Sequence, residues 1–289
     1  MVVTDGDCVC EPGKTLVSGH CCWPGQDFGS ARKACMGKPK SCPADRVAAA
    51  DGCITHAMQA RRDSMVLVPA AKVELAAYPN AKRSGIVEVA SFQLDEGEVT
   101  VGAYAACVRA EKCAKPGPPS ESKKASVQAQ EPLCNWGKPG RDAHPMNCLS
   151  QAEAAAFCAW RERRLPTEEE WQAAAEGGEK RTYPWGAEAP ADRACWDGAG
   201  SKAGAGKRTS TCASKSFASG KSAQGAFDLA GNVWEWTSSC LDADCKEVVA
   251  RGGAWFNGTA SSLKGALRQG EGKTTSSPGL GFRCARANE

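Results

Sequence analysis

Gly231-Asn232-Val233-Trp234-Glu235-Trp236, with Arg251-Gly252-Gly253 downstream, combines turn-forming residues with large aromatic side chains. Glycine and asparagine readily adopt the positive φ angles that tight turns need. Each tryptophan brings a large apolar area and an N–H group that can reach a backbone carbonyl. We therefore expect this segment to be scaffold, in the core of a domain with many turns and little regular secondary structure.

Phrases of the same kind surround this segment. They are Pro145–Ser150 (PMNCLS), Arg164–Trp171 (RLPTEEEW), Tyr183–Gly186 (YPWG), Phe227–Trp236 (FDLAGNVWEW) and Gly281–Cys284 (GFRC). In this order they resemble the formylglycine-generating enzyme (sulfatase-modifying factor) family, over roughly residues 65–286. The resemblance implies that family's fold, an α+β domain related to C-type lectins. We expect Trp171, Trp185, Trp234, Trp236 and Trp255 to be buried in it, as aromatic residues usually are.

The resemblance also implies a disulfide between Cys158 and Cys284. It further implies one calcium ion, held by the side chains of Asp228 and Glu235 and the carbonyl groups of Gly231 and Val233. Oxygen ligands crowded into eight residues suit a hard cation on independent grounds. Two alternatives stay open: Asp228 caps a turn, and Glu235 forms an ion pair with Arg251 or Arg283.

The family's catalytic residues are missing from this chain. Its oxidases bind copper(I) with two cysteines five residues apart, just after the Arg-Gly-Gly phrase, because soft thiolates suit that ion. Here Asn257 stands at the first position and about Ser262 at the second, and no cysteine lies between Cys245 and Cys284. We therefore expect no copper and no catalytic residue, and a candidate ligand groove at Trp255, Asn257 and Ser262.

Residues 1–60 form a different kind of segment. It contains seven cysteines among Gly and Pro, with few large apolar residues besides Trp23 and Phe28. A segment with so little core-forming material needs covalent cross-links to hold a shape. We expect a small disulfide-stapled module with little regular structure, followed by the larger domain over residues 65–286.

The chain has 17 cysteines in all, no CxxC pair and only three histidines. This composition disfavours zinc sites and favours disulfides, which form in oxidising compartments. Cys240 with Cys245 and Cys195 with Cys212 are the further expected pairs, because those loops are short enough to close at low entropic cost. The protein is thus expected to be exported, to the periplasm, the cell surface or the extracellular space, although the segment after Met1 does not resemble a leader.

Charge and hydropathy exclude two classes of partner. The formal net charge is only +3, from 36 basic and 33 acidic residues, and no basic run is interleaved with aromatic residues. Nucleic acid is therefore not expected as a partner. No stretch of about 18 apolar residues occurs, so no membrane span is expected.

Local patterns place several strands and helices. Residues 65–69 and 92–95 are typical of strands, and Thr100 can cap the helix that follows. Ser150 with Glu153 and Thr167 with Glu170 form capping boxes that start two further helices. The second of these helices, with Trp171 and Ala174 facing inward, should end at Gly177-Gly178.

Two functions remain in competition. The first is a non-catalytic family member that acts as a binding or scaffold module for a peptide, a protein or a glycan. The second is an oxidase that converts a sulfatase cysteine to formylglycine through some other thiol arrangement. The empty interval between Cys245 and Cys284 favours the first. A hydrolase is not expected, because no Gly-x-Ser-x-Gly elbow with a histidine partner occurs.

Overall fold

A computed structural model describes residues 64–79, 81–117 and 131–288, and the segments 2–4, 7–9, 14–17, 20–29, 34–36, 39–43, 46–49 and 52–55 of the first part of the chain. The chain divides into two compact units. One consists of residues 1–64 with 105–114, and the other of residues 65–104 with 115–289. Each unit is described below by itself.

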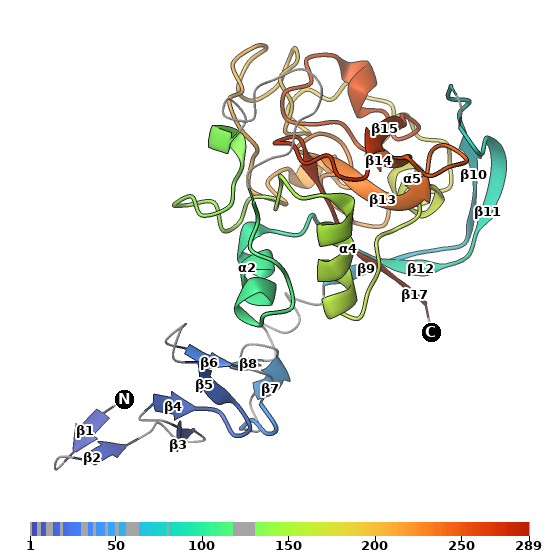
Figure 1. Cartoon of the computed structure of the whole chain (residues 1–289). Coiled ribbons are helices and arrows are strands. Elements are labelled where there is room, and N and C mark those ends of the chain that lie inside the picture. Colours follow the sequence, from blue (N-terminus) through green and yellow to red (C-terminus); the bar gives the residue numbers. More distant parts are fainter. Residues whose placement is uncertain are drawn as a thin grey trace. The chain divides into compact units, whose positions relative to one another are not determined.

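The described part of the first unit contains four successive antiparallel hairpins (Figure 1). Their strands are β1 (Val2–Thr4) with β2 (Asp7–Val9), β3 (Thr15–Val17) with β4 (His20–Cys22), β5 (Asp27–Gly29) with β6 (Ala34–Met36), and β7 (Arg46–Ala49) with β8 (Gly52–Thr55). The sequence-based expectation of little regular structure was wrong here. Glycine-containing dipeptides such as Asp5-Gly6 and Ser18-Gly19 stand between short strands, and such dipeptides favour hairpins.

Disulfides join the described segments of this unit. Cys22 in β4 is bonded to Cys35 in β6, and Cys42 is bonded to Cys53 in β8. Each closes a loop of little more than ten residues, with sequence separations of 13 and 11. By restricting the unfolded chain, such bridges supply stability that a small apolar core cannot.

The described residues of the second unit form a three-stranded sheet, a four-stranded sheet and a two-stranded hairpin. The three-stranded sheet has the order β17–β12–β9 and is formed by Ala285–Ala287, Phe92–Asp95 and Met65–Val68, all antiparallel neighbours. The four-stranded sheet has the order β15–β14–β13–β16 and is formed by Gln269–Gly272, Glu247–Arg251, Trp234–Cys240 and Leu280–Gly281. The last pair, β13 with β16, is parallel. The strand expected at residues 65–69 and the one at 92–95 are therefore both present.

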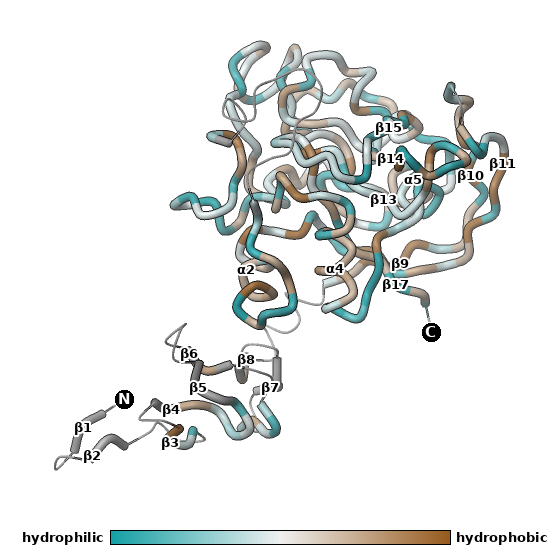
Figure 2. Tube along the Cα trace, viewed as in Figure 1, coloured by the Kyte–Doolittle hydropathy of each residue, from teal (hydrophilic) through white to brown (hydrophobic). Residues whose placement is uncertain are grey.

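A hairpin of β10 (Ala71–Leu75) and β11 (Gly85–Val89) completes the strands of this unit. Figure 2 shows the alternation of hydrophobic and hydrophilic residues along β10. Val73 and Leu75 are buried, whereas Lys72 and Glu74 are exposed. This period of two is what a strand with one face on the core requires.

Three α-helices are described: α2 (Val101–Arg109), α4 (Gln151–Trp160) and α5 (Glu168–Glu176). Three short 3₁₀ helices lie at Glu131–Leu133 (η1), Ala218–Gly220 (η2) and Ala260–Leu263 (η3). Both predicted capping boxes are present, at the starts of α4 and α5. Thr100 Oγ1 accepts the Ala103 N–H at 3.3 Å, as expected for a cap of α2. Helix α5 ends at Gly177, whose φ is 65°.

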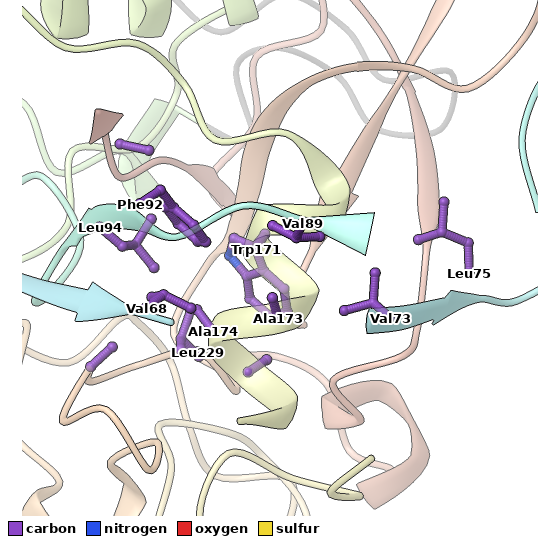
Figure 3. Close-up of a cluster of buried hydrophobic side chains, with 13 residues drawn as sticks. Val68, Val73, Leu75, Val89, Phe92, Leu94, Trp171, Ala173, Ala174 and Leu229 are labelled. Atoms are coloured by element: carbon purple, nitrogen blue, oxygen red, sulfur yellow. The ribbon is translucent and has the colours of Figure 1, made fainter. Parts of the chain in front are cut away.

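The main hydrophobic core forms where α5 meets the β10–β11 hairpin and the three-stranded sheet (Figure 3). The Trp171 ring lies at the centre of this cluster and is fully buried. Ala173 and Ala174 present a small surface beside it, so strands can approach the helix closely. The other labelled members of the cluster are Val68, Val73, Leu75, Val89, Phe92, Leu94 and Leu229.

Four of the five tryptophans expected in the core are buried. Trp171, Trp234, Trp236 and Trp255 are each at most 6% exposed. Trp185 is only partly buried: its ring stacks on Tyr183, with centroids 5.3 Å apart and planes 9° apart. The reason is local. Trp185 lies in the short turn between Tyr183 and Gly186, which pair as an isolated β-bridge, and this turn holds the ring near the surface.

A group of fully buried charges connects α5 to the four-stranded sheet. Glu168, the first residue of α5, accepts hydrogen bonds from Arg251 Nη2 at 3.0 Å and from Arg268 Nη2 at 2.8 Å. Arg251 Nη2 also donates to Gln172 Oε1 at 2.9 Å. Charges this deeply buried are tolerated only when each is paired and hydrogen-bonded.

Five disulfides lie outside the first 64 residues. Cys158 is bonded to Cys284 across 126 residues of sequence, Cys195 to Cys212, and Cys240 to Cys245, which are the three pairs expected from the sequence. Cys107–Cys113 and Cys134–Cys148 are two more. In the described residues, no helix combines the length and the apolar character needed to cross a membrane.

We predict that Glu168→Gln lowers the free energy of unfolding by about 3–5 kcal/mol, because it leaves two buried guanidinium groups without a counter-charge. The measurement is urea denaturation followed by circular dichroism. Glu74→Gln serves as the matched control, because Glu74 pairs with Lys180 on the exposed face and little change is expected there. Equal effects from the two variants would contradict this assignment of the buried ion pairs.

Candidate functional site

The motif Gly231–Trp236 forms a tight turn that leads into β13. Gly231 has a φ of 81° and Asn232 a φ of 62°. A Cβ at position 231 would lie 2.5 Å from the carbonyl oxygen of Cys195. Only glycine meets both conditions, which explains why the motif begins with it.

Asn232 is a buried residue whose hydrogen bonds connect four parts of the unit. Its N–H donates to the Cys195 carbonyl at 2.7 Å, and its own carbonyl accepts the Trp255 N–H at 2.8 Å. Its side-chain Oδ1 accepts the Cys212 N–H at 2.9 Å, and its Nδ2 donates to Glu98 Oε2 at 2.6 Å. The loops that carry the candidate site residues are therefore held by side-chain hydrogen bonds rather than by a regular sheet.

Three buried carboxyl groups, those of Glu98, Asp228 and Glu235, gather around the Arg283 guanidinium. Glu235 Oε1 accepts from Arg283 Nη2 at 2.7 Å, and Glu235 Oε2 accepts from Arg283 Nε at 2.7 Å. Glu235 Oε2 also accepts from Trp171 Nε1 at 2.8 Å. Of the alternatives open from the sequence, the ion pair with Arg283 is thus the one formed.

This crowding changes the pKa of the Glu98 carboxyl group. Burial, and then the nearby charges of Asp228 and Glu235, raise its pKa well above the usual range. Its second oxygen, Oε1, has no hydrogen-bond partner among the described residues. Burial also raises the pKa of Asp228, although the Lys215 N–H donates to its Oδ2 at 2.6 Å. The cluster therefore has an excess of buried acid over base.

These residues can be tested as the calcium ligands that the family resemblance implies. Among the described residues, Glu235 Oε1 accepts one hydrogen bond, from Arg283 Nη2, so one of its lone pairs remains for a cation. In the described part of the chain, no group of three or more His, Cys, Asp or Glu side chains is arranged so that these side chains alone could hold a metal ion. A calcium ion would therefore depend on the carbonyl groups of Gly231 and Val233, which is the mixed ligand set expected from the sequence.

Asn257 and Ser262, at the positions of the family's catalytic cysteines, both take part in local turns. Asn257 Oδ1 accepts the Ala254 N–H at 2.7 Å, and Ser262 Oγ lies 2.9 Å from Thr259 Oγ1. The Asn257 carbonyl accepts the Asp197 N–H at 3.0 Å. The two side chains thus hold backbone and hydroxyl groups in place, and neither offers the thiolate that copper(I) chemistry needs.

The aromatic residue available at this surface is Phe256 rather than Trp255. Trp255 is only 6% exposed and packs against Cys195 and Phe217, whereas Phe256 is 46% exposed. The two rings meet edge to face, with centroids 5.2 Å apart. The Phe256 ring lies against Gly279, where a Cβ would come within 2.5 Å of it. Trp255 is therefore a core residue, and Phe256 is the exposed ring beside Asn257.

The backbone against which the Phe256 ring lies is held from within the unit. Asn147 Nδ2 donates to the Pro278 carbonyl at 2.8 Å, next to Gly279. We call the exposed Phe256 ring, together with the Pro278-Gly279 backbone, the Phe256 surface.

Sequence reasoning missed three residues of this region: Glu98, Asn232 as a hub, and Phe256. Glu98 lies between a strand and a capped helix, and no local pattern marks it as buried. Phe256 stands beside a tryptophan, and nothing in the sequence tells which of the two rings is exposed. The presence of asparagine in a Gly-Asn turn was the available signal for Asn232, because such a side chain often bonds nearby backbone.

Comparison with known proteins identifies relatives of this architecture. Residues 51–288 match the model of the sulfatase-modifying factor enzyme 1-like domain. The chain is 39% identical over 151 residues to the inactive C-alpha-formylglycine-generating enzyme 2 of Bos taurus, covering 49% of this chain and 50% of that protein. It is 34% identical over 170 residues to the formylglycine-generating enzyme of Streptomyces coelicolor, covering 50% and 54%. The chain thus spans about half the length of the curated relatives it matches.

The solved structure of PvdO from Pseudomonas aeruginosa has the same fold. It superimposes with a TM-score of 0.60 and 22% identity, covering 78% of this chain and 94% of PvdO. The α+β, formylglycine-generating-enzyme-like fold expected from the sequence is therefore confirmed. The match of residues 51–288 to the family model shows that this chain belongs to the family of the sulfatase-modifying factor enzyme 1-like domain.

Proposed function

We propose that this chain is a non-catalytic member of its family that binds a peptide, a protein or a glycan outside the cytosol. The observation that carries the proposal is the state of the two positions at which the family's oxidases have cysteines. Asn257 and Ser262 occupy them, and both side chains are engaged in turns. The similarity to a relative named as inactive supports the same view.

Export is supported by the disulfides. Cross-links join cysteines in both units, from Cys22–Cys35 to Cys158–Cys284. Structural disulfides persist in oxidising compartments and are rare where thiols are kept reduced. We therefore propose a periplasmic, cell-surface or extracellular location.

We predict that the purified chain does not convert the cysteine of a sulfatase-type peptide to formylglycine, with or without copper. Two well-placed thiolates are needed to hold copper(I), and an amide and a hydroxyl are hard, neutral replacements. Mass spectrometry of the peptide detects the aldehyde product, with the Streptomyces coelicolor enzyme as the positive control. Aldehyde formed in proportion to the amount of this chain would establish the oxidase alternative instead.

The Phe256 surface is the place we propose for ligand contact. An exposed aromatic ring held rigidly on a glycine backbone loses little conformational entropy when a ligand covers it, and aromatic residues dominate binding energy at interfaces. The surface lies directly beside Asn257, in the region where the family resemblance places the groove.

We predict that a phage-displayed random peptide library or a glycan array yields ligands of the wild-type chain, and that Phe256→Ser weakens their binding at least about tenfold. Ile86→Ser is the matched control, because Ile86 is also an exposed apolar side chain, 72% exposed, but lies on the β10–β11 hairpin. Selected ligands that bind both variants equally would rule out the Phe256 surface. If neither the peptide library nor the glycan array yields a ligand, the result would count against a module that binds peptides or glycans.

We also propose that calcium binds at Asp228, Gly231, Val233 and Glu235. The excess of buried carboxyl groups around Arg283 and the unpartnered oxygen of Glu98 support it, because a divalent cation would offset that excess. The ion would have a structural role here, since it would stabilise the turn that begins β13. No step of chemistry is assigned to it.

We predict that millimolar calcium raises the melting temperature over a chelator-treated sample by about 2–4 °C, because an ion that binds only the folded state stabilises it by mass action. Asp228→Asn should abolish this difference, whereas Asp244→Asn, at an exposed residue paired with Lys246, should preserve it. Differential scanning calorimetry provides the measurement, with magnesium as the ion control. Identical melting curves in chelator and calcium would show that Asp228 and Glu235 are turn and ion-pair residues only.

A further inference from the structure

The disulfide between Cys195 and Cys212 lies next to a positively charged side chain. Arg208 Nη1 donates to Cys212 Sγ at a distance of 2.9 Å. The guanidinium is held there by two other contacts of the same residue: its Nε donates to the Trp196 carbonyl at 2.8 Å, and its backbone N–H donates to Asp197 Oδ1 at 2.7 Å. The cation therefore has a fixed position relative to the sulfur.

The two sulfur-bearing residues differ in their access to solvent. Cys195 is 1% exposed and packs with Phe217 and Trp255, whereas Cys212 is only partly buried. Both residues of the Cys158–Cys284 bridge, by contrast, are fully buried. The Cys212 side of the first bridge is thus less buried than either side of the second.

We propose that the Cys195–Cys212 disulfide is a thiol–disulfide exchange site whose reaction partner is a dithiol reductant. Two features of the structure support this assignment: the partial exposure of Cys212, and the guanidinium of Arg208 directly beside its sulfur. A cation at this position stabilises a thiolate on Cys212 and hence the reduced form of the pair.

The exchange proceeds in two balanced steps. A thiolate of the reductant attacks Cys212 Sγ, the bond between the two protein sulfurs breaks, and Cys195 leaves as a thiolate that takes up a proton. The second thiolate of the reductant then attacks the reductant's own sulfur in the mixed disulfide. Cys212 leaves in this step as a thiolate paired with Arg208, and a lower pKa makes a thiol a better leaving group. The reductant loses two electrons and becomes a disulfide.

Reduction would loosen the segment between the two cysteines without releasing its ends. Asn232 accepts the Cys212 N–H and donates to the Cys195 carbonyl, and neither hydrogen bond depends on the sulfur bridge. Within the segment, Asp197 bonds to the Asn257 carbonyl, so the segment lies against the candidate binding site. Glycine-rich backbone from residue 198 to 206 allows it to move once the bridge opens.

The test is a titration of the full-length oxidised chain with dithiothreitol against its oxidised form. Each point is quenched with acid, alkylated and analysed by peptide mass spectrometry, which reports the reduced fraction of every bridge. We expect Cys195–Cys212 to open before Cys158–Cys284, with the far-ultraviolet circular dichroism unchanged. In Arg208→Gln the half-reduction point should move to an about tenfold higher ratio of reduced to oxidised reagent, because the thiolate loses its counter-charge.

Two controls keep the outcome decisive. Arg193→Gln removes an arginine close to Cys195 in sequence, whose Nη1 donates to the Ala189 carbonyl at 3.2 Å, and it should leave the titration unchanged. Arg208→Lys keeps the charge and should shift the half-reduction point less than Arg208→Gln. If Arg208→Gln does not fold, the order of opening in the wild-type chain and the Lys variant still decide the matter. The proposal would be overturned if Cys195–Cys212 opened together with Cys158–Cys284. It would also be overturned if folded Arg208→Gln had the same half-reduction point as the wild-type chain.

Discussion

The ion pair between Glu235 and Arg283 is where contacts from several separate parts of the chain meet. Arg283 Nη2 donates to the Phe227 carbonyl at 2.7 Å as well as to Glu235, and Arg283 Nη1 donates to the Asp95 carbonyl at 3.2 Å. Trp171 reaches the same carboxylate from α5. Burying a charged pair costs several kcal/mol per ion, and that cost is offset only when the remaining donors and acceptors are satisfied. The two sheets, the core helix and the turn before β13 are therefore mutually dependent.

In a fold with this much irregular backbone, side chains must supply the hydrogen-bond partners that neighbouring strands supply in a sheet. Buried N–H and C=O groups must be paired, and turns that lack regular partners obtain them from asparagine and arginine. The Asn232 side chain accepts the Cys212 N–H, and Arg251 donates to the carbonyl groups of Gly265 and Leu267. The asparagine and arginine of the sequence motifs are thus explained by backbone pairing, before any ligand is considered.

Features that depend on neighbouring residues were predictable from the sequence, and features that depend on distant ones were not. The boxes at Ser150 and Thr167 involve residues three apart, so the pattern alone identifies both helix starts. The pairing of Glu235 with Arg283 rather than Arg251 depends on β13 lying beside β16, a parallel contact with no local signal. The exposure of Phe256 depends in the same way on the distant Gly279.

The family's fold does not depend on its catalytic cysteines, and the structure shows why. The ion pairs of Arg283 with Glu235 and of Arg251 with Glu168 lie within the core, and neither involves position 257 or 262. At those positions the side chains bond only to residues three away in sequence. Replacement of a cysteine there by an amide or a hydroxyl therefore changes a local turn and leaves the long-range contacts intact. On the function proposed for this chain, the thiol chemistry would be absent while the same scaffold holds the adjacent surface with Phe256.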